Sequence, residues 1–136
     1  MKCIEGVAAI LIKDEKIAAF KRNHGNYAGY YEFVGGKIEA NESKEEALIR
    51  ECKEEINIDI SIDSFFKTIS YNYNDFMLTL HCYLCYPLSD NIQLHVHDDL
   101  VWVDETTIES LNWLPADRQM MDQLKQLCLD IKCIIE

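Results

Sequence analysis

The sequence predicts an α/β fold in a single domain that spans residues 1–136. Stretches with the apolar pattern of strands alternate along the chain with two stretches of helical period, which is typical of α/β folds. A chain of this length can bury a core of its own, and it contains only two prolines and no repeat or low-complexity tract that would suggest a linker. The stretch that organises the rest is a glycine pair, Gly35-Gly36, followed by a helix rich in carboxylates.

The chain opens with a predicted hairpin. Residues 6–12 and 17–21 are apolar runs, and the charged residues between them form the turn. The second run ends in two cations, Lys21 and Arg22, which are common at a solvated strand end. A polar loop over residues 23–31 then leads into a further strand pattern that ends at the glycine pair.

The helix after the glycine pair is predicted from residue 43 to about residue 56. Ser43 and Glu46 have the spacing of a capping box, which satisfies backbone N–H groups at the start of a helix. At about 100° per residue, Glu51, Glu54 and Glu55 fall within roughly a third of a turn of one another. Apolar residues occupy a neighbouring sector, so one side of this helix packs and another gathers negative charge.

Three carboxylates on one helix face repel each other, and a hard divalent cation removes that repulsion. Mg²⁺ and Mn²⁺ prefer oxygen ligands and often bind through a few carboxylates together with substrate phosphates. The pattern therefore predicts a Mg²⁺ site, with Mn²⁺ as the alternative metal, that works on a phosphorylated ligand. A solvated acidic helix face is the other interpretation of the same residues.

Strands follow this helix. We expect a short strand over residues 59–62 and two longer strands over residues 65–73 and 76–86, which turn at Asn74-Asp75. The aromatic residues and the methionine of the last strand either pack into the core or line a pocket for a base.

The C-terminal part is predicted to hold a polar loop, a short strand and a helix. The loop runs from His95 to Asp99 and leads into a strand that ends at Val103. The helix is expected over residues 118–131, with Asp117 as its N-cap.

The formal charge of −11 argues against DNA or RNA as a partner, because long backbone contacts need clustered cations. A mononucleotide remains compatible, since a metal and a few local cations suffice to bind it. The apolar runs are too short to span a membrane, and the first residues lack the layout of a signal peptide, so we expect a cytoplasmic protein.

Six cysteines could indicate disulfides, but we expect reduced thiols in a cytoplasmic protein. Cys82 and Cys85 lie in one predicted strand, where alternation puts them on opposite faces. No second close pair completes a zinc site at the usual spacing, and two histidines at positions 95 and 97 are weak evidence for one.

The glycine loop and the acidic helix together resemble the signature box of the Nudix hydrolases. Gly36 is followed after five residues by Glu42, and after seven more by Arg50-Glu51-Cys52-Lys53-Glu54-Glu55-Ile56-Asn57-Ile58. The family usually has glycine where this chain has Asn57. Asn tolerates the left-handed conformation at a helix C-terminus better than other non-glycine residues, so the turn is expected to survive.

This resemblance implies the Nudix α/β/α sandwich, in which a mixed central sheet lies between helices. It implies that Glu51, Glu54 and Glu55 hold Mg²⁺ with the Gly36 carbonyl as a further ligand, and that Glu42 and Arg50 form a structural pair. It also implies that Arg22, at its strand end, reaches the substrate phosphates. We group Lys37 with Arg22 as substrate-binding.

The segment Tyr31-Glu32-Phe33-Val34-Gly35-Gly36-Lys37 resembles the MutT-like subgroup, which usually has proline in place of Val34. In related enzymes, the loop that here contains Asp98 and Asp99 often supplies a Glu as acid or base. Either Asp is expected to take that role, with His97 as a further candidate and a plain solvated turn as the alternative. The segment Pro115-Ala116-Asp117 resembles the base-recognition corner of MutT-like enzymes and CTP pyrophosphohydrolases.

The activity that this resemblance implies is hydrolysis of a nucleoside triphosphate to the monophosphate and pyrophosphate, by a monomer or a homodimer. Because an ionised Asp only accepts hydrogen bonds, Asp117 predicts a cytidine-type substrate with an exocyclic amino group. Hydrolysis of oxidised purine nucleotides, as in 8-oxo-dGTP diphosphatases, or of nucleotide sugars is the enzymatic alternative. A nucleotide-sensing binding module is the non-enzymatic alternative.

Overall fold

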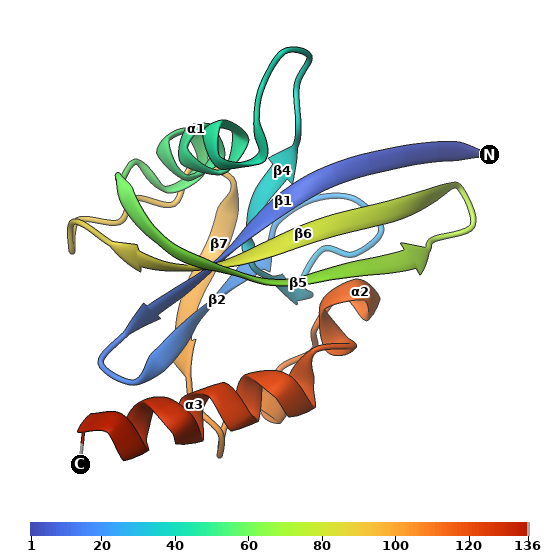
Figure 1. The fold of residues 1–136 in the computed structure, drawn as a ribbon. Coiled ribbons are helices and arrows are strands. Elements are labelled where there is room, and N and C mark those ends of the chain that lie inside the picture. Colours follow the sequence, from blue (N-terminus) through green and yellow to red (C-terminus); the bar gives the residue numbers. More distant parts are fainter. Residues whose placement is uncertain (136) are drawn as a thin grey trace.

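In the computed structural model, which describes residues 1–135, a mixed sheet is covered by a helix on each face (Figure 1). The strands are β1 (Lys2–Lys13), β2 (Lys16–Arg22), β3 (Tyr31–Glu32), β4 (Val34–Lys37), β5 (Ile60–Asn72), β6 (Phe76–Pro87) and β7 (His97–Val103). The helices are α1 (Lys44–Ile56), α2 (Pro115–Arg118) and α3 (Met121–Ile135), with a 3₁₀ turn η1 (Ile108–Ser110) before α2.

Strand β1 is the centre of the sheet. It runs parallel to β6, from Lys2 opposite Phe76 to Leu11 opposite Cys85, and antiparallel to β4. Strand β5 forms the edge beyond β6, while β2 carries β3 and β7. The predicted opening turn is present, but β1 and β2 pair at only two positions before they diverge. The main partners of β1 come from distant parts of the chain, which local sequence patterns do not reveal.

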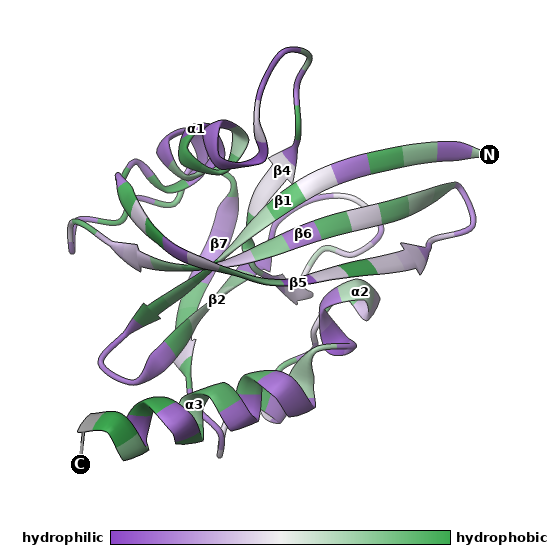
Figure 2. Cartoon of the chain, in the orientation of Figure 1, coloured by the Kyte–Doolittle hydropathy of each residue, from purple (hydrophilic) through white to green (hydrophobic). Residues whose placement is uncertain are grey.

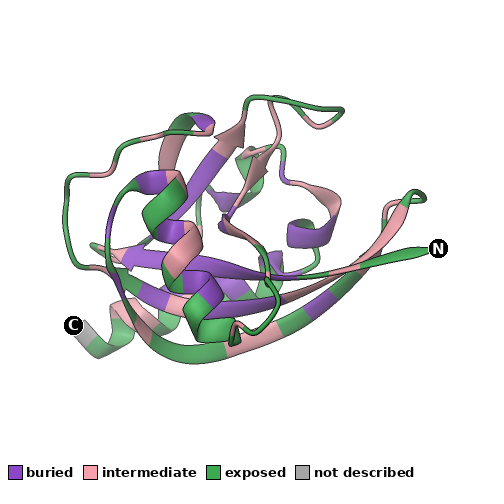
Figure 3. Ribbon diagram, turned by 90° about the horizontal axis from the view of Figure 1, so that it is seen from above, coloured by how far each residue is buried: buried purple, intermediate pink, exposed green. Residues whose placement is uncertain are grey.

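Each face of the sheet has its own core. Alternation along β1 sends Val7, Ala9 and Leu11 toward α1, and Ala8 and Ile10 toward α3. Hydrophobic residues concentrate along the central strands, and the middle of the sheet is buried (Figures 2 and 3). The predicted α/β/α sandwich with a mixed sheet is therefore confirmed.

The prediction of separate strands over residues 59–62 and 65–73 is wrong. Strand β5 is continuous from Ile60 to Asn72, and its pairing with β6 shifts register twice, between Ile62 and Ser64 and between Phe65 and Lys67. Such bulges bend a strand and interrupt the alternation of its side chains. In the sequence, this interruption of the alternation looks like a gap between two strands.

The predicted final helix is divided. Pro115 begins the short helix α2, and α3 starts only at Met121. Asp117 therefore lies inside the first turn of α2, where Leu114 is the N-cap, and the prediction that Asp117 caps the last helix is wrong. Proline is favoured at the first position of a helix because it needs no N–H partner there.

Two further predictions concern β7 and the thiols. The segment from His97 onward is already strand, so His97, Asp98 and Asp99 are held by β7 rather than by a loop. Cys82 and Cys85 belong to cores on opposite faces of the sheet, as predicted, and all six cysteines are free. No helix among residues 1–135 is both long and apolar enough to cross a membrane.

Candidate active site

Helix α1 is fixed at both ends by local hydrogen bonds. The Ser43 hydroxyl accepts from the Glu46 N–H at 3.0 Å, and the Glu46 carboxylate accepts from the Ser43 N–H at 2.9 Å, which is the predicted capping box. At the other end Asn57 is left-handed, with φ 58°, and its N–H donates to the Lys53 carbonyl. The predicted turn without glycine is therefore confirmed, and the acidic side of α1 is held in a defined orientation.

The two glycines of β4 allow the chain to approach its neighbours closely. A Cβ on Gly35 would lie 2.0 Å from the Val7 carbonyl oxygen, and one on Gly36 would lie 2.5–2.7 Å from the Glu51 carboxylate. No side chain fits at position 35, where backbone atoms block it, and a side chain at position 36 would displace the Glu51 carboxylate. The Gly35 N–H donates to Glu55 at 3.1 Å, so the glycine strand is bound directly to the acidic helix.

Arg50 joins the loop before α1 to the helix. It donates to both carboxylate oxygens of Glu42, at 2.6 and 2.9 Å, and to the Lys37 carbonyl at 3.0 Å. The same guanidinium contacts Glu51 at 2.7 Å and Glu54 at 3.3 Å. Hydrogen bonding to Arg50 lowers the pKa of Glu42 to about 2, so Glu42 stays ionised as the anchor of this network.

The three helix carboxylates have different environments. Burial raises the pKa of Glu55 to about 7, against the opposing hydrogen bond from Gly35, and burial also raises the pKa of Glu51. Glu54 is 59% exposed. Among residues 1–135 no three acidic, His or Cys side chains already form a metal cluster, and Arg50 offsets the charge of Glu51 and Glu54.

The donor set nevertheless fits a hard cation. The Glu51 carboxylate lies against the space that a Cβ on Gly36 would fill, and the Glu55 carboxylate accepts from the Gly35 N–H, so two carboxylates meet the glycine strand. Oxygen donors of this kind match the preference of Mg²⁺. A cation there would also offset the charge of the partly buried carboxylates Glu51 and Glu55.

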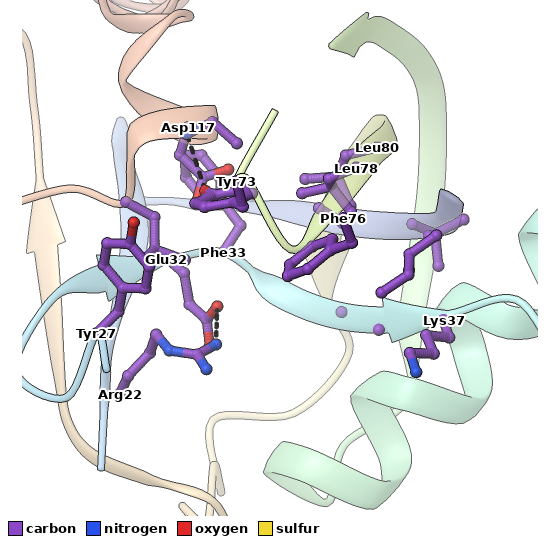
Figure 4. Close-up of a pocket in the computed structure, with 18 of the residues that line it drawn as sticks. Arg22, Tyr27, Glu32, Phe33, Lys37, Tyr73, Phe76, Leu78, Leu80 and Asp117 are labelled. Atoms are coloured by element: carbon purple, nitrogen blue, oxygen red, sulfur yellow. Dashed lines mark hydrogen bonds and ion pairs between the residues drawn. The ribbon is translucent and has the colours of Figure 1, made fainter. Parts of the chain in front are cut away.

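A cavity of about 870 Å³ extends from this region across the sheet (Figure 4). Gly35, Gly36, Lys37 and Glu55 line it near α1, whereas Tyr73 and Asp117 lie on the other side. Arg22 and Glu32 project into it from β2 and β3, as Figure 4 shows. The cavity thus joins an acidic end to an aromatic end, and Arg22 and Lys37 contribute cations to its lining.

The model of the NUDIX domain family matches residues 6–123. The chain belongs to the Nudix family. It is a Nudix hydrolase, and this family acts on phosphoric anhydride bonds.

The CTP pyrophosphohydrolase of Escherichia coli K12 is 32% identical over 128 residues, which cover 93% of this chain and 95% of that protein. The 8-oxo-dGTP diphosphatase of Proteus vulgaris is 43% identical over 56 residues, covering 41% and 50%.

Solved structures show the same architecture. The solution structure of the E. coli ORF135 protein matches with a TM-score of 0.76 and 32% identity, over 90% of this chain and 88% of that one. The MutT protein of Methanosarcina mazei matches with a TM-score of 0.81 and covers 92% of this chain and 94% of that one, but at 20% identity it shows the fold alone.

Around the Nudix box, the structure brings most of the predicted site residues together. Gly36, Glu55, Arg22, Lys37 and Asp117 all line the cavity. Glu51 lies directly against Gly36, while Glu54 faces outward beside Arg50.

Asp98 and Asp99 do not line the cavity. Both are exposed on β7, and the Asp99 carboxylate accepts from the Leu100 N–H at 2.8 Å. His97 lines the cavity instead. Alternation along β7 turns Asp98 to the other face, and the pairing of β7 with β2 shifts register between Lys21, opposite Asp99, and Arg22, opposite His97, so Asp99 does not follow His97 into the cavity. A catalytic role for either Asp stays a prediction.

Sequence reasoning missed Glu32. Its carboxylate accepts from Arg22 Nη1 at 2.9 Å and from His97 Nε2 at 2.9 Å, so it joins β2, β3 and β7 beside the cavity. The available signal was a single acidic residue inside the otherwise apolar and aromatic segment Tyr31–Val34. Buried charges need partners, and that residue was therefore a candidate for an ion pair.

Asp117 lies at the aromatic end of the Nudix cavity. Burial raises its pKa well above the ordinary value, with Glu32 adding to the rise and Arg22 opposing it. Beside it, the Tyr73 hydroxyl accepts from the Ala116 N–H at 3.1 Å, and burial raises the pKa of Tyr73 to about 12. The Tyr73 ring stacks on Phe76, with ring centroids 5.3 Å apart. A flat apolar wall therefore stands next to a buried polar group.

Proposed function

We propose that this chain hydrolyses nucleoside triphosphates to the monophosphate and pyrophosphate with Mg²⁺, and that it prefers a cytidine-type nucleotide. The observation that carries the proposal is the single cavity that joins the acidic helix to the aromatic wall beside Asp117. Its two ends are complementary to the two ends of a nucleotide, a metal-bound polyphosphate and a planar base.

Each residue has a role in this proposal. Glu51, Glu54 and Glu55, with the Gly36 carbonyl, hold the metal, while Arg22 and Lys37 contact phosphate oxygens. When bound, the metal polarises phosphoryl oxygens and lowers the pKa of a bound water. A bound cation would offset the charge of Glu51 and Glu54 that Arg50 offsets here, and Arg50 would keep its hydrogen bonds with Glu42.

The base preference rests on the protonation state of Asp117. An ionised carboxylate accepts from the amino group of cytosine but opposes the O4 carbonyl of uracil. A protonated carboxyl has both a donor and an acceptor, and it can pair with cytosine, with uracil or with the N1–H and O6 edge of an oxidised guanine. Because burial favours the protonated form, hydrolysis of 8-oxo-dGTP is the second candidate activity.

A panel of CTP, dCTP, UTP, dTTP, 8-oxo-dGTP and a nucleotide sugar, at equal concentration with Mg²⁺, tests the proposal. We expect nucleoside monophosphate and pyrophosphate as products, and a ratio of kcat/KM for CTP over UTP that grows with pH as Asp117 ionises. A ratio that is flat with pH and unchanged in Asp117→Ala would remove the basis for the cytidine preference. Binding of nucleotide without turnover would favour a sensing module.

A further inference from the structure

Glu32 lies between two residues of the cavity and contacts both. Oε1 accepts from Arg22 and Oε2 accepts from His97, each at 2.9 Å. The side chains of Glu32 and His97 are 19% and 1% exposed, so little water competes for these hydrogen bonds. One carboxylate therefore aligns side chains from two different strands, β2 and β7.

Both aligned side chains keep one polar atom without a partner. Within residues 1–135 the buried side-chain nitrogen and oxygen atoms that lack a hydrogen bond are Arg22 Nε, His97 Nδ1 and Asp117 Oδ1. All three belong to residues that line the cavity. A buried polar atom without a partner costs free energy, so their concentration in one cavity points to a ligand that satisfies them.

The contact with Glu32 decides which hydrogen-bonding role His97 plays. An ionised carboxylate only accepts, so the neutral ring carries its hydrogen on Nε2 and donates it to Glu32. Nδ1 is then unprotonated and is an acceptor. Arg22, whose Nη1 donates to the same carboxylate, has its Nε–H left as a free donor. The two unpaired atoms, Arg22 Nε and His97 Nδ1, therefore offer one donor and one acceptor.

We propose that Glu32 is a positioning residue that fixes the Nε2–H form of His97, so that His97 Nδ1 accepts a hydrogen bond from an O–H group of the bound substrate complex. Arg22, fixed by the other oxygen of Glu32, donates to the same ligand. The O–H group belongs either to the water that attacks phosphorus or to the 2′-hydroxyl of the nucleotide. The choice between these two sources rests on the proposed function, but the proton position on His97 does not.

Glu32→Gln tests this because it replaces one carboxylate oxygen by an NH₂ group and so reverses the donor and acceptor roles of the two His97 nitrogens. The amide oxygen of Gln still accepts from Arg22, so its NH₂ group must face His97 Nε2, which then has to be the acceptor. The ring hydrogen moves to Nδ1, and the unpaired nitrogen of His97 becomes a donor. We expect ¹⁵N NMR of labelled histidine to show Nε2–H in the wild type and Nδ1–H in Glu32→Gln, at a pH where the ring is neutral.

We expect kcat/KM of Glu32→Gln to fall by about tenfold or more, as for one mispaired hydrogen bond in a buried site. A fall in kcat for both CTP and dCTP assigns the O–H group to the attacking water. A rise in KM for CTP that is absent for dCTP assigns it to the 2′-hydroxyl. The matched control is Glu5→Gln, because Glu5 also contacts a histidine, His81 at 3.1 Å, but does not line this cavity.

An unchanged proton position in Glu32→Gln, or a reversed one with wild-type kcat/KM, would overturn the proposal. If Glu32→Gln does not fold, His97→Gln takes its place: its amide can still donate to Glu32 but lacks the Nδ1 acceptor, so kcat/KM must fall similarly. If the wild type hydrolyses no nucleotide, the proposed function fails by itself. The inference is then decided by CTP binding in an NMR titration, which Glu32→Gln must weaken by about tenfold.

Discussion

At the scale of single residues, the three carboxylates on the acidic side of α1 lie in different environments. Glu55 is partly buried beside Gly35, Glu51 lies against Gly36, and Glu54 faces outward. An exposed carboxylate next to an arginine contributes little to stability. Any large effect of changing Glu54 must therefore come from binding or chemistry.

Glu54→Gln is expected to lower kcat by about 100-fold or more at saturating Mg²⁺, because a neutral amide is a poor ligand for a hard cation. Steady-state kinetics and a melting curve of the same preparation measure this. The matched control is Glu45→Gln, an exposed residue of the same helix, which should keep wild-type turnover. If folded Glu54→Gln keeps wild-type activity, Glu54 is not a ligand of the catalytic metal.

Asp117 gives a prediction about stability and pH. Its pKa is raised in the folded state, so between the ordinary value of about 4 and the raised value the folded protein binds more protons than the unfolded chain. The contribution of Asp117 to stability is therefore fully present below about pH 4 and is lost as the pH rises through the raised pKa.

Asp117→Asn removes this titration. We expect its Tm relative to the wild type to increase from pH 4 to pH 8, because only the wild type loses the contribution of Asp117 over this range. Asp122→Asn, at an exposed position in the first turn of α3, is the control that should show no such trend. A constant Tm difference across this range would contradict the raised pKa.

At the scale of elements, local interactions of the residues at each end set where α1 begins and ends. The Ser43 capping box starts it, and the left-handed Asn57 stops it. Left-handed backbone costs most residues about 1–2 kcal/mol, and glycine avoids that cost.

Asn57→Ala is therefore expected to lower the free energy of unfolding by about 1 kcal/mol, whereas Asn57→Gly stays within about 0.5 kcal/mol of the wild type. Denaturant titration of the three proteins measures the difference. Equal losses in both variants would mean that the Asn57 side chain, which contacts Gln93 at 3.3 Å, matters more than its backbone conformation.

At the scale of the whole molecule, metal binding and folding are linked. Helix α1 gathers the three carboxylates on one side, and the glycine strand β4 meets that side only in the folded protein, so the unfolded chain lacks the site. Ligand that binds only the folded state stabilises it by mass action.

Mg²⁺ or Mn²⁺ at about 100 times its Kd should add about 2.7 kcal/mol to the free energy of unfolding. Thermal melting with and without metal measures this, and Glu51→Gln should reduce the gain. An unmoved Tm at millimolar metal, even with a non-hydrolysable nucleotide present, would show that these carboxylates are only a solvated face.

The parts of the molecule whose causes are local can be predicted from the sequence. The start and end of α1 and the need for glycine before it follow from residues that are neighbours along the chain. The continuity of β5, the burial of Asp117 and the contacts of Glu32 could not be predicted in this way, because each depends on partners from distant segments. Glu32 and His97 are 65 positions apart, and it is the pairing of β2 with both β3 and β7 that places one carboxylate between Arg22 and His97.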